Sequence, residues 1–151
     1  MKPSLIRHAR LLALVAATAT AFSAHALMRG TTADGSPFVE GGIGADETTA
    51  LEAQRDQYSL WLITAVRVSG AYLAEVQLRI TDERGRVLLE RKMSGPWLLV
   101  NLPLGRYELQ ASYRGETLRR TATIHAGDHH QVIFHFGVQG EMQPPPKPEA
   151  R

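Results

Sequence analysis

The stretch Gly95-Pro-Trp-Leu-Leu-Val-Asn-Leu-Pro-Leu-Gly-Arg-Tyr-Glu-Leu-Gln-Ala-Ser-Tyr113 contains two expected strands and the corner that joins them. Residues 97–102 are mostly apolar and favour β structure. In residues 107–113 apolar and polar side chains alternate, which predicts a strand with one face on a core. Pro103 fixes its φ angle and Gly105 tolerates a positive one, so the chain turns between them. We expect the Tyr107 ring to be buried at this corner, with its hydroxyl bonded to nearby backbone.

Short strands and tight turns continue on both sides of this stretch. The further expected strands cover residues 58–68, 71–81, 86–92, 117–125 and 130–136. Residues 82–85 and 114–116 read as hairpin turns. The connections are too short for crossover helices. The sequence therefore predicts an all-β fold, an antiparallel two-sheet β-sandwich of about seven strands with one short N-terminal helix.

Residues 27–57 are predicted to be an extended leader followed by the short helix, because residues 27–44 are rich in Gly, Thr and Ser without a sustained period. Gly41-Gly42-Ile43-Gly44 before this helix looks like a phosphate loop. No Gly-Lys-Ser/Thr follows it, so a turn is the better interpretation. Asp46 and Glu47 suit the positive end of the helix.

The two ends of the chain carry different signals. Residues 1–26 have the pattern of a signal peptide, with a basic start, an apolar run too short to span a membrane, and Ala24-His25-Ala26 as the cleavage site. We expect cleavage near Ala26 and a periplasmic or secreted protein that does not span the membrane. Residues 138–151 form a Pro-rich tail that is expected to be disordered.

Charge and composition exclude some classes of function. The chain has 17 Lys and Arg against 15 Asp and Glu. Three of these bases lie in the signal peptide, so 17 less 3 leaves 14, a net charge of −1 after cleavage. This balance argues against a nucleic-acid partner. Cysteine is absent, so the stability of an exported domain must come from packing without disulfides.

Several motifs resemble one family. Ala74-Glu-Val-Gln-Leu-Arg-Ile-Thr-Asp-Glu-Arg-Gly85, Gly95-Pro-Trp97, Leu102-Pro-Leu-Gly-Arg-Tyr107 and Ala126-Gly127 resemble carboxypeptidase regulatory-like domains. These domains are transthyretin-like (prealbumin-like) β-sandwiches, and small exported proteobacterial proteins carry one alone. The resemblance covers residues 58–137. It implies a non-catalytic accessory or binding module of the cell envelope, whose partner is another envelope protein or a glycan, with no cofactor.

The histidines offer an alternative function. His125, His129 and His130 lie around the last predicted turn, and neutral imidazoles placed together can hold zinc or copper. The chain would then be a periplasmic Cu/Zn-binding protein that uses this turn. The spacing matches no established zinc motif, so a polar surface turn is the competing interpretation. His135 alternates with two phenylalanines and should point away from the face they share.

Residues for catalysis are harder to find, and we expect no catalytic site and no enzyme activity. There is no Gly-x-Ser-x-Gly elbow. Tyr113-Arg-Gly-Glu116 resembles the Tyr-Arg-Gly-Ser end of transthyretin-like hydroxyisourate hydrolases only in part, because it is internal and ends in Glu. Trp61, Tyr72 and Trp97 fit core positions better than a binding platform. A basic hairpin is expected to be a solvated sheet edge; its residues are Arg84, Arg86, Arg91 and Lys92.

Overall fold

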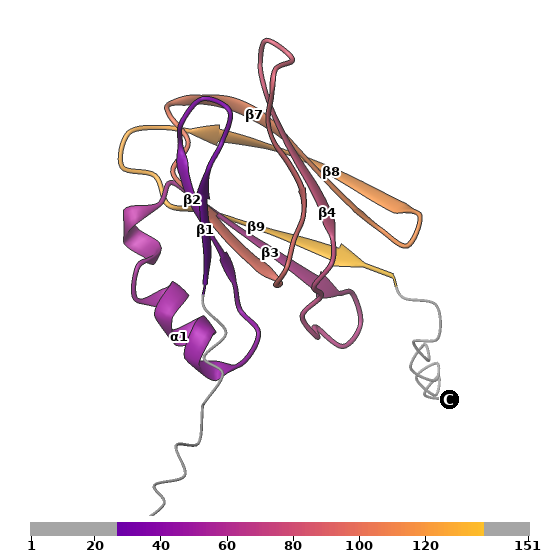
Figure 1. Ribbon diagram of the computed structural model, residues 1–151. Coiled ribbons are helices and arrows are strands. Elements are labelled where there is room, and N and C mark those ends of the chain that lie inside the picture. Colours follow the sequence, from indigo (N-terminus) through magenta and orange to yellow (C-terminus); the bar gives the residue numbers. More distant parts are fainter. Residues whose placement is uncertain (1–26, 138–151) are drawn as a thin grey trace, which may run out of the picture.

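The computed structural model describes residues 27–137, so the predicted signal peptide and Pro-rich tail lie outside the described residues. Within this range the chain is mostly β (Figure 1). The strands are β1 (Met28–Thr31), β2 (Pro37–Gly41), β3 (Leu60–Val66), β4 (Gln77–Asp82), β5 (Val87–Lys92), β6 (Trp97–Val100), β7 (Gly105–Tyr113), β8 (Glu116–Ile124) and β9 (His130–Phe136). Helix α1 (Ala45–Glu52) and a 3₁₀ turn (Arg55–Gln57) lie between β2 and β3.

The strands form two sheets. The five-stranded sheet has the order β1-β2-β6-β3-β9, and the four-stranded sheet has the order β5-β4-β7-β8. All pairs are antiparallel except β3 with β9, which is parallel. The prediction of about seven antiparallel strands was therefore wrong in two respects: residues 27–137 form nine strands, and one sheet is mixed. The parallel pair arises because the short turn after β8 crosses from one sheet to the other instead of closing a hairpin.

The two additional strands come from the predicted leader. Residues 28–31 and 37–41 pair with each other, and β2 continues the sheet by pairing with β6. The sheets therefore include residues well before 58, where the sequence placed the first strand. Phe38 packs in the core between the sheets, while Val39 packs on the opposite face. Because both faces of β2 are covered, it shows no apolar–polar alternation to reveal it.

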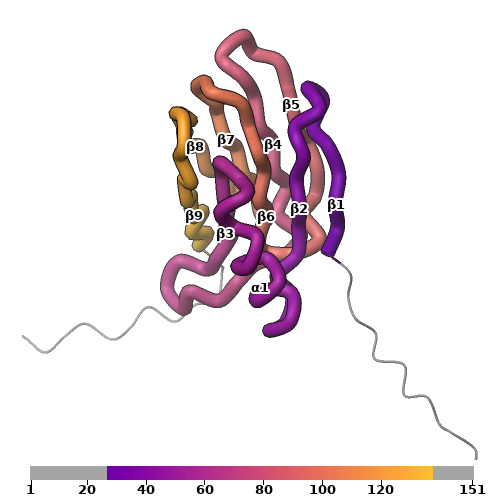
Figure 2. The backbone as a smooth tube through the Cα atoms, turned by 90° about the vertical axis from the view of Figure 1, so that its left-hand side faces the viewer, coloured from indigo at the N-terminus to yellow at the C-terminus, as the bar shows by residue number. Residues whose placement is uncertain are grey.

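The two sheets pack face to face around one core, to which both contribute. Apolar residues that alternate along β4, β7 and β9 point into it, as the period of two predicted. A second, smaller core lies on the other side of the five-stranded sheet, beneath α1 (Figure 2). Its buried residues are Val39, Leu51, Tyr58, Trp61, Ile63, Trp97 and Leu99. Both tryptophans are thus core residues.

The corner in the opening stretch connects the two sheets, because β6 belongs to one and β7 to the other. The Tyr107 side chain is buried, and its hydroxyl donates a 2.8 Å hydrogen bond to the Pro103 carbonyl oxygen. This confirms the predicted tyrosine corner. The turn of residues 82–85 is confirmed as the β4–β5 hairpin, with Gly85 at φ 78°. The expected strand over residues 71–81 was wrong in its first half, because β4 begins at Gln77, and Tyr72, expected in the core, is exposed.

The N-terminal segment contains two buried glutamates, of which Glu40 was not anticipated and Glu47 was expected only as an acid at the start of the helix. Glu40 is fully buried and lies 2.7 Å from Arg91 Nε, so Arg91 is an internal ion-pair partner and not part of a solvated edge. The Glu47 carboxylate accepts hydrogen bonds of 2.9 Å from the amides of Gly42 and Ile43. Those are amides that a phosphate loop would offer to an anion, which agrees with the interpretation as a turn.

Candidate functional site

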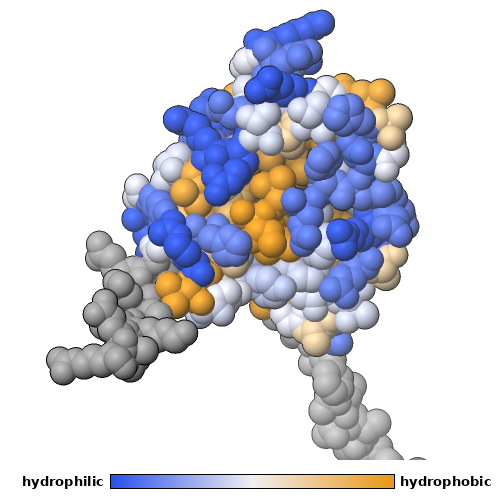
Figure 3. Space-filling model, turned by 180° about the vertical axis from the view of Figure 1, so that it is seen from behind, coloured by the Kyte–Doolittle hydropathy of each residue, from blue (hydrophilic) through white to orange (hydrophobic). Residues whose placement is uncertain are grey.

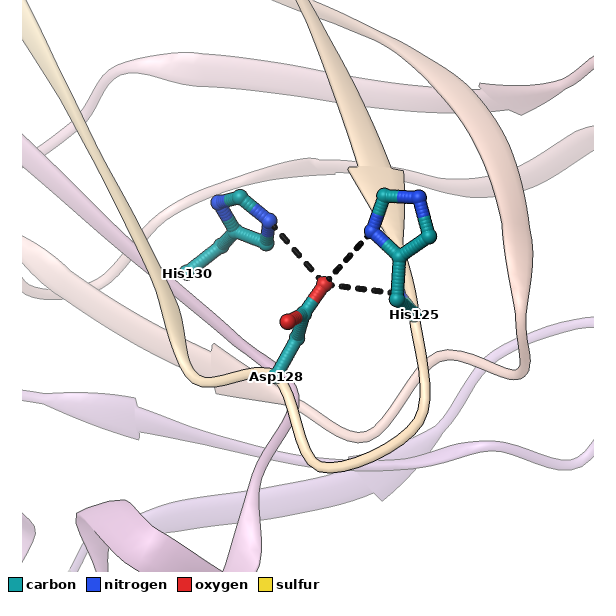
Figure 4. Close-up of side chains that lie close together, drawn as sticks. All are labelled: His125, Asp128 and His130. Atoms are coloured by element: carbon teal, nitrogen blue, oxygen red, sulfur yellow. Dashed lines mark hydrogen bonds and ion pairs between the residues drawn. The ribbon is translucent and has the colours of Figure 1, made fainter.

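Two side chains predicted as metal ligands meet between the end of β8 and the start of β9. His125 follows β8 directly, and His130 is the first residue of β9. The turn between them places Asp128 in the middle, with its carboxylate facing both imidazoles (Figure 4). We call His125, Asp128 and His130 the histidine cluster. Each offers one ligand atom, and the three atoms lie within 4.8 Å of one another. Because β8 and β9 belong to different sheets, the cluster sits where the sheets are joined.

One carboxylate oxygen organises the cluster. Asp128 Oδ2 accepts a 2.7 Å hydrogen bond from the His125 backbone amide. The same oxygen lies 3.0 Å from His125 Nδ1 and 3.2 Å from His130 Nε2. The side chains remain accessible, with exposed fractions of 72% for His125, 44% for His130 and 29% for Asp128. The cluster is therefore open to ions and small ligands from solvent.

The environment of Asp128 favours its charged form. The hydrogen bond from the His125 backbone amide is the largest influence and lowers the pKa of the Asp128 carboxyl below its ordinary value of 3.8. Burial acts in the opposite direction, while the His125 side chain and the charge of His130 add to the lowering. Asp128 is therefore an ionised oxygen donor at neutral pH.

His129, the third predicted ligand, is not part of the cluster. Its Nδ1 lies 2.9 Å from the carbonyl oxygen of Tyr58. Asp128 takes the place that was expected for His129. A signal for this existed in the sequence, since an Asp that closes a Gly-containing turn commonly bonds back to a preceding backbone amide. His135 lies near the far end of β9. Its side chain is exposed, as the alternation with the two buried phenylalanines predicted.

A cavity of about 320 Å³ adjoins the cluster. His125 and Asp128 both line it, as do polar side chains from the segments before β3 and after β6. Among these are Gln57 and Asn101, and His129 of the turn before β9 also lines the cavity. A ligand bound at the cluster would therefore contact solvent on one side and this partly polar cavity on the other.

The second feature is the side of the molecule where β8 and β9 lie next to each other. Each is the last strand of its sheet, so neither has a further strand on its outer side within residues 27–137. Viewed from this side, apolar surface is visible between polar stretches (Figure 3). Tyr113, Leu118 and Val132 are partly buried here against the main core. We call this side, formed by β8 and β9, the lateral edge.

The direction of the backbone of β9 follows from its pairing with β3. The His130 amide donates to Ser59, and the Phe136 carbonyl accepts from Arg67, so these two residues bond toward β3. In a parallel pair the bonding residues alternate. The backbone groups of Gln131, Ile133 and His135 therefore face outward along the lateral edge. At its end the His135 carbonyl accepts a 3.3 Å hydrogen bond from Arg67.

Comparison with known proteins gives no assignment. No protein-family model matches the chain, and neither a curated protein nor a solved structure does so. Among residues 27–137, no helix has the length and apolar character needed to cross a membrane.

Proposed function

We propose that the chain is a non-catalytic accessory module of the cell envelope that binds another envelope protein along its lateral edge. The observation that carries this proposal is that no strand within residues 27–137 pairs with the outer side of β9, which is flanked by apolar side chains. Export to the periplasm or beyond is supported by the signal-peptide pattern of residues 1–26. The motifs shared with carboxypeptidase regulatory-like domains support a transthyretin-like β-sandwich and a role without catalysis.

The occupant proposed for this edge is an extended segment of a partner protein that adds to β9 as a further strand. In such binding, main-chain hydrogen bonds supply affinity, and alternate side chains supply specificity. The outward backbone groups of Gln131 and Ile133 offer the hydrogen bonds. The partly buried side chains of Leu118 and Val132 offer apolar contacts to every second residue of the segment.

Charge selects an acidic segment. Arg119 and Arg120 of β8 are both exposed. Arg119 already lies 3.9 Å from Glu108 of β7, whereas Arg120 has no acidic partner within residues 27–137, and its guanidinium lies 5.9 Å from the centre of the Phe134 ring. His135 of β9 adds an exposed imidazole to the two arginines of β8. The only acid that belongs to either strand is Glu116, and it is already paired with Arg67 at 2.8 Å. A segment that alternates acidic with apolar residues therefore complements the edge.

The chain's own tail is a poor occupant of the same edge. Residues 144–146 are consecutive prolines, which have no amide hydrogen to donate to a strand ladder. The tail also has no net charge, because Glu141 and Glu149 balance Lys147 and Arg151. It lacks the acidic character that the edge selects.

The proposal is tested by titrating the ¹⁵N-labelled protein, without its signal peptide, with a synthetic peptide of alternating Glu and Val. The expected result is a set of amide shifts confined to β8 and β9. A peptide of alternating Lys and Val is the matched probe, and it should bind at least about tenfold more weakly. Amide shifts located elsewhere, or no shifts with either peptide, would contradict the proposal. A soluble glycan is titrated in the same way. If only the glycan causes shifts, the partner is a sugar and not a protein.

A further inference from the structure

We propose that His125, Asp128 and His130 form a binding site for one divalent transition-metal ion, of the class of Zn²⁺ or Cu²⁺. This site is separate from strand addition along β9 and does not depend on it. It differs from the site that the histidine pattern predicted, because an aspartate replaces His129 as the third ligand.

The distances in the cluster are close to those that a metal requires. With bonds of about 2.0–2.2 Å in a tetrahedral site, two ligand atoms lie about 3.3–3.6 Å apart. His125 Nδ1 and His130 Nε2 are 3.0 Å and 3.2 Å from Asp128 Oδ2. The two nitrogens lie within 4.8 Å of each other, so rotation of the exposed imidazoles is needed to bring all three atoms around one ion.

The supporting structure holds the ligands at fixed positions. The His125 amide donates to Asp128 Oδ2 at 2.7 Å, which orients the carboxylate as outer-shell partners of metal ligands do. The His130 amide donates to the Ser59 carbonyl at 2.9 Å and fixes the start of β9. A metal held here would link the end of one sheet to the start of a strand in the other, and so would raise the unfolding temperature.

The ligand set selects the kind of ion. Two imidazole nitrogens and one carboxylate oxygen suit Zn²⁺, Cu²⁺ or Ni²⁺. Ca²⁺ and Mg²⁺ prefer oxygen ligands only, and six or more of them in the case of Ca²⁺. Affinity should follow the usual order, with Cu²⁺ bound more tightly than Zn²⁺. Three protein ligands leave a fourth position, which water or a small ligand in the adjoining cavity would fill.

The competing explanation is that Asp128 only closes the turn, with the imidazoles as its exposed neighbours. The two explanations differ in which histidines matter. A metal site needs His125 and His130 together, whereas weak binding by surface imidazoles would depend about equally on His129 and His135.

The test is isothermal titration of the protein without its signal peptide, and without any affinity tag, using Zn²⁺, Cu²⁺ and Ca²⁺ in turn. We expect one Zn²⁺ or Cu²⁺ per chain and no uptake of Ca²⁺. His130→Ala and Asp128→Asn should each weaken binding by at least about tenfold. His135→Ala and His129→Ala are the matched controls and should leave the affinity within about twofold.

A spectroscopic measurement keeps the proposal falsifiable if a variant folds poorly. In the unmodified protein, Zn²⁺ should shift the imidazole nitrogen signals of His125 and His130 and leave those of His135 unchanged. Absence of uptake at millimolar metal, or binding that His130→Ala does not weaken, would overturn the site. Equal losses in all four variants would show adventitious binding by surface histidines.

Discussion

The Tyr107 hydroxyl donates a 2.8 Å hydrogen bond to the Pro103 carbonyl oxygen and closes the corner where the chain leaves one sheet for the other. Tyr107→Phe removes this bond but keeps the buried ring. A hydrogen bond of this kind contributes about 1 kcal/mol, so the melting temperature should fall by several degrees. Peptide and metal binding should not change. Tyr72→Phe, at an exposed tyrosine, is the control, and an unchanged melting temperature for Tyr107→Phe would refute the account of the corner.

The ion pair between Glu40 and Arg91 should be important for stability because its carboxylate is fully buried. Arg91→Met would leave that charge without its cation and should cost about 3 kcal/mol of the free energy of unfolding. Arg79→Met is a matched control, because the Arg79–Glu90 pair is exposed and 3.6 Å apart. It should cost less than about 1 kcal/mol. Denaturant unfolding measures both, and equal losses would show that burial of the pair does not matter.

The Glu47 carboxylate should stabilise the turn before α1, because it accepts hydrogen bonds from the amides of both Gly42 and Ile43. Glu47→Ala leaves these two amides without their acceptor and should cost about 1–2 kcal/mol. Glu52→Ala, at an exposed position of the same helix, should be nearly neutral. Thermal unfolding of the two variants checks this, and a Glu47→Ala protein as stable as Glu52→Ala would contradict it.

Asp34 should make stability depend on acid pH. Burial alone would raise the pKa of its carboxyl, but hydrogen bonds from Thr32 and Ser36 outweigh this and lower it below 3.8. A carboxyl whose pKa is lower in the folded state stabilises the fold above the unfolded value, and this contribution is lost as the pH falls through the folded value.

The variant Asp34→Asn isolates this contribution. It should be less stable than the original protein by a constant amount above about pH 5, and the difference should shrink as the pH falls below about 4. Urea unfolding between pH 7 and pH 2.5 measures the difference. A gap that stays constant or widens toward low pH would show that the hydrogen bonds do not favour the ionised form.

The sequence revealed those parts of the fold that depend on local chemistry. The corner at Pro103 and Tyr107 and the hairpin turn at Gly85 were identified because proline, glycine and a period of two have direct backbone consequences. Strands β1 and β2 were missed, since β2 is covered on both faces and β1 is short. The parallel pairing of β9 with β3 was missed because it depends on which sheet the chain enters after residue 125, and no local pattern specifies that.

Only part of the candidate metal site could be predicted, because part of it depends on contacts between residues far apart in the sequence. His125 and His130 were identified by residue type and proximity in sequence. The choice of Asp128 over His129 depends on side-chain direction in the turn and on the Tyr58 carbonyl, which lies far away in the sequence. The lateral edge was not predicted at all, because it exists only once both sheets have formed.

Binding of a partner protein to the outer side of β9 is tested by comparing Ile133→Pro with Ile133→Val. The proline removes an outward amide that the β3 pairing does not use, and the valine keeps it. Each variant is used as bait in an extract of the periplasm, where we propose that the protein acts, after circular dichroism shows equal folding. We expect one protein to be captured by the original chain and by Ile133→Val, and to be lost with Ile133→Pro. Capture of the same protein by all three would contradict it.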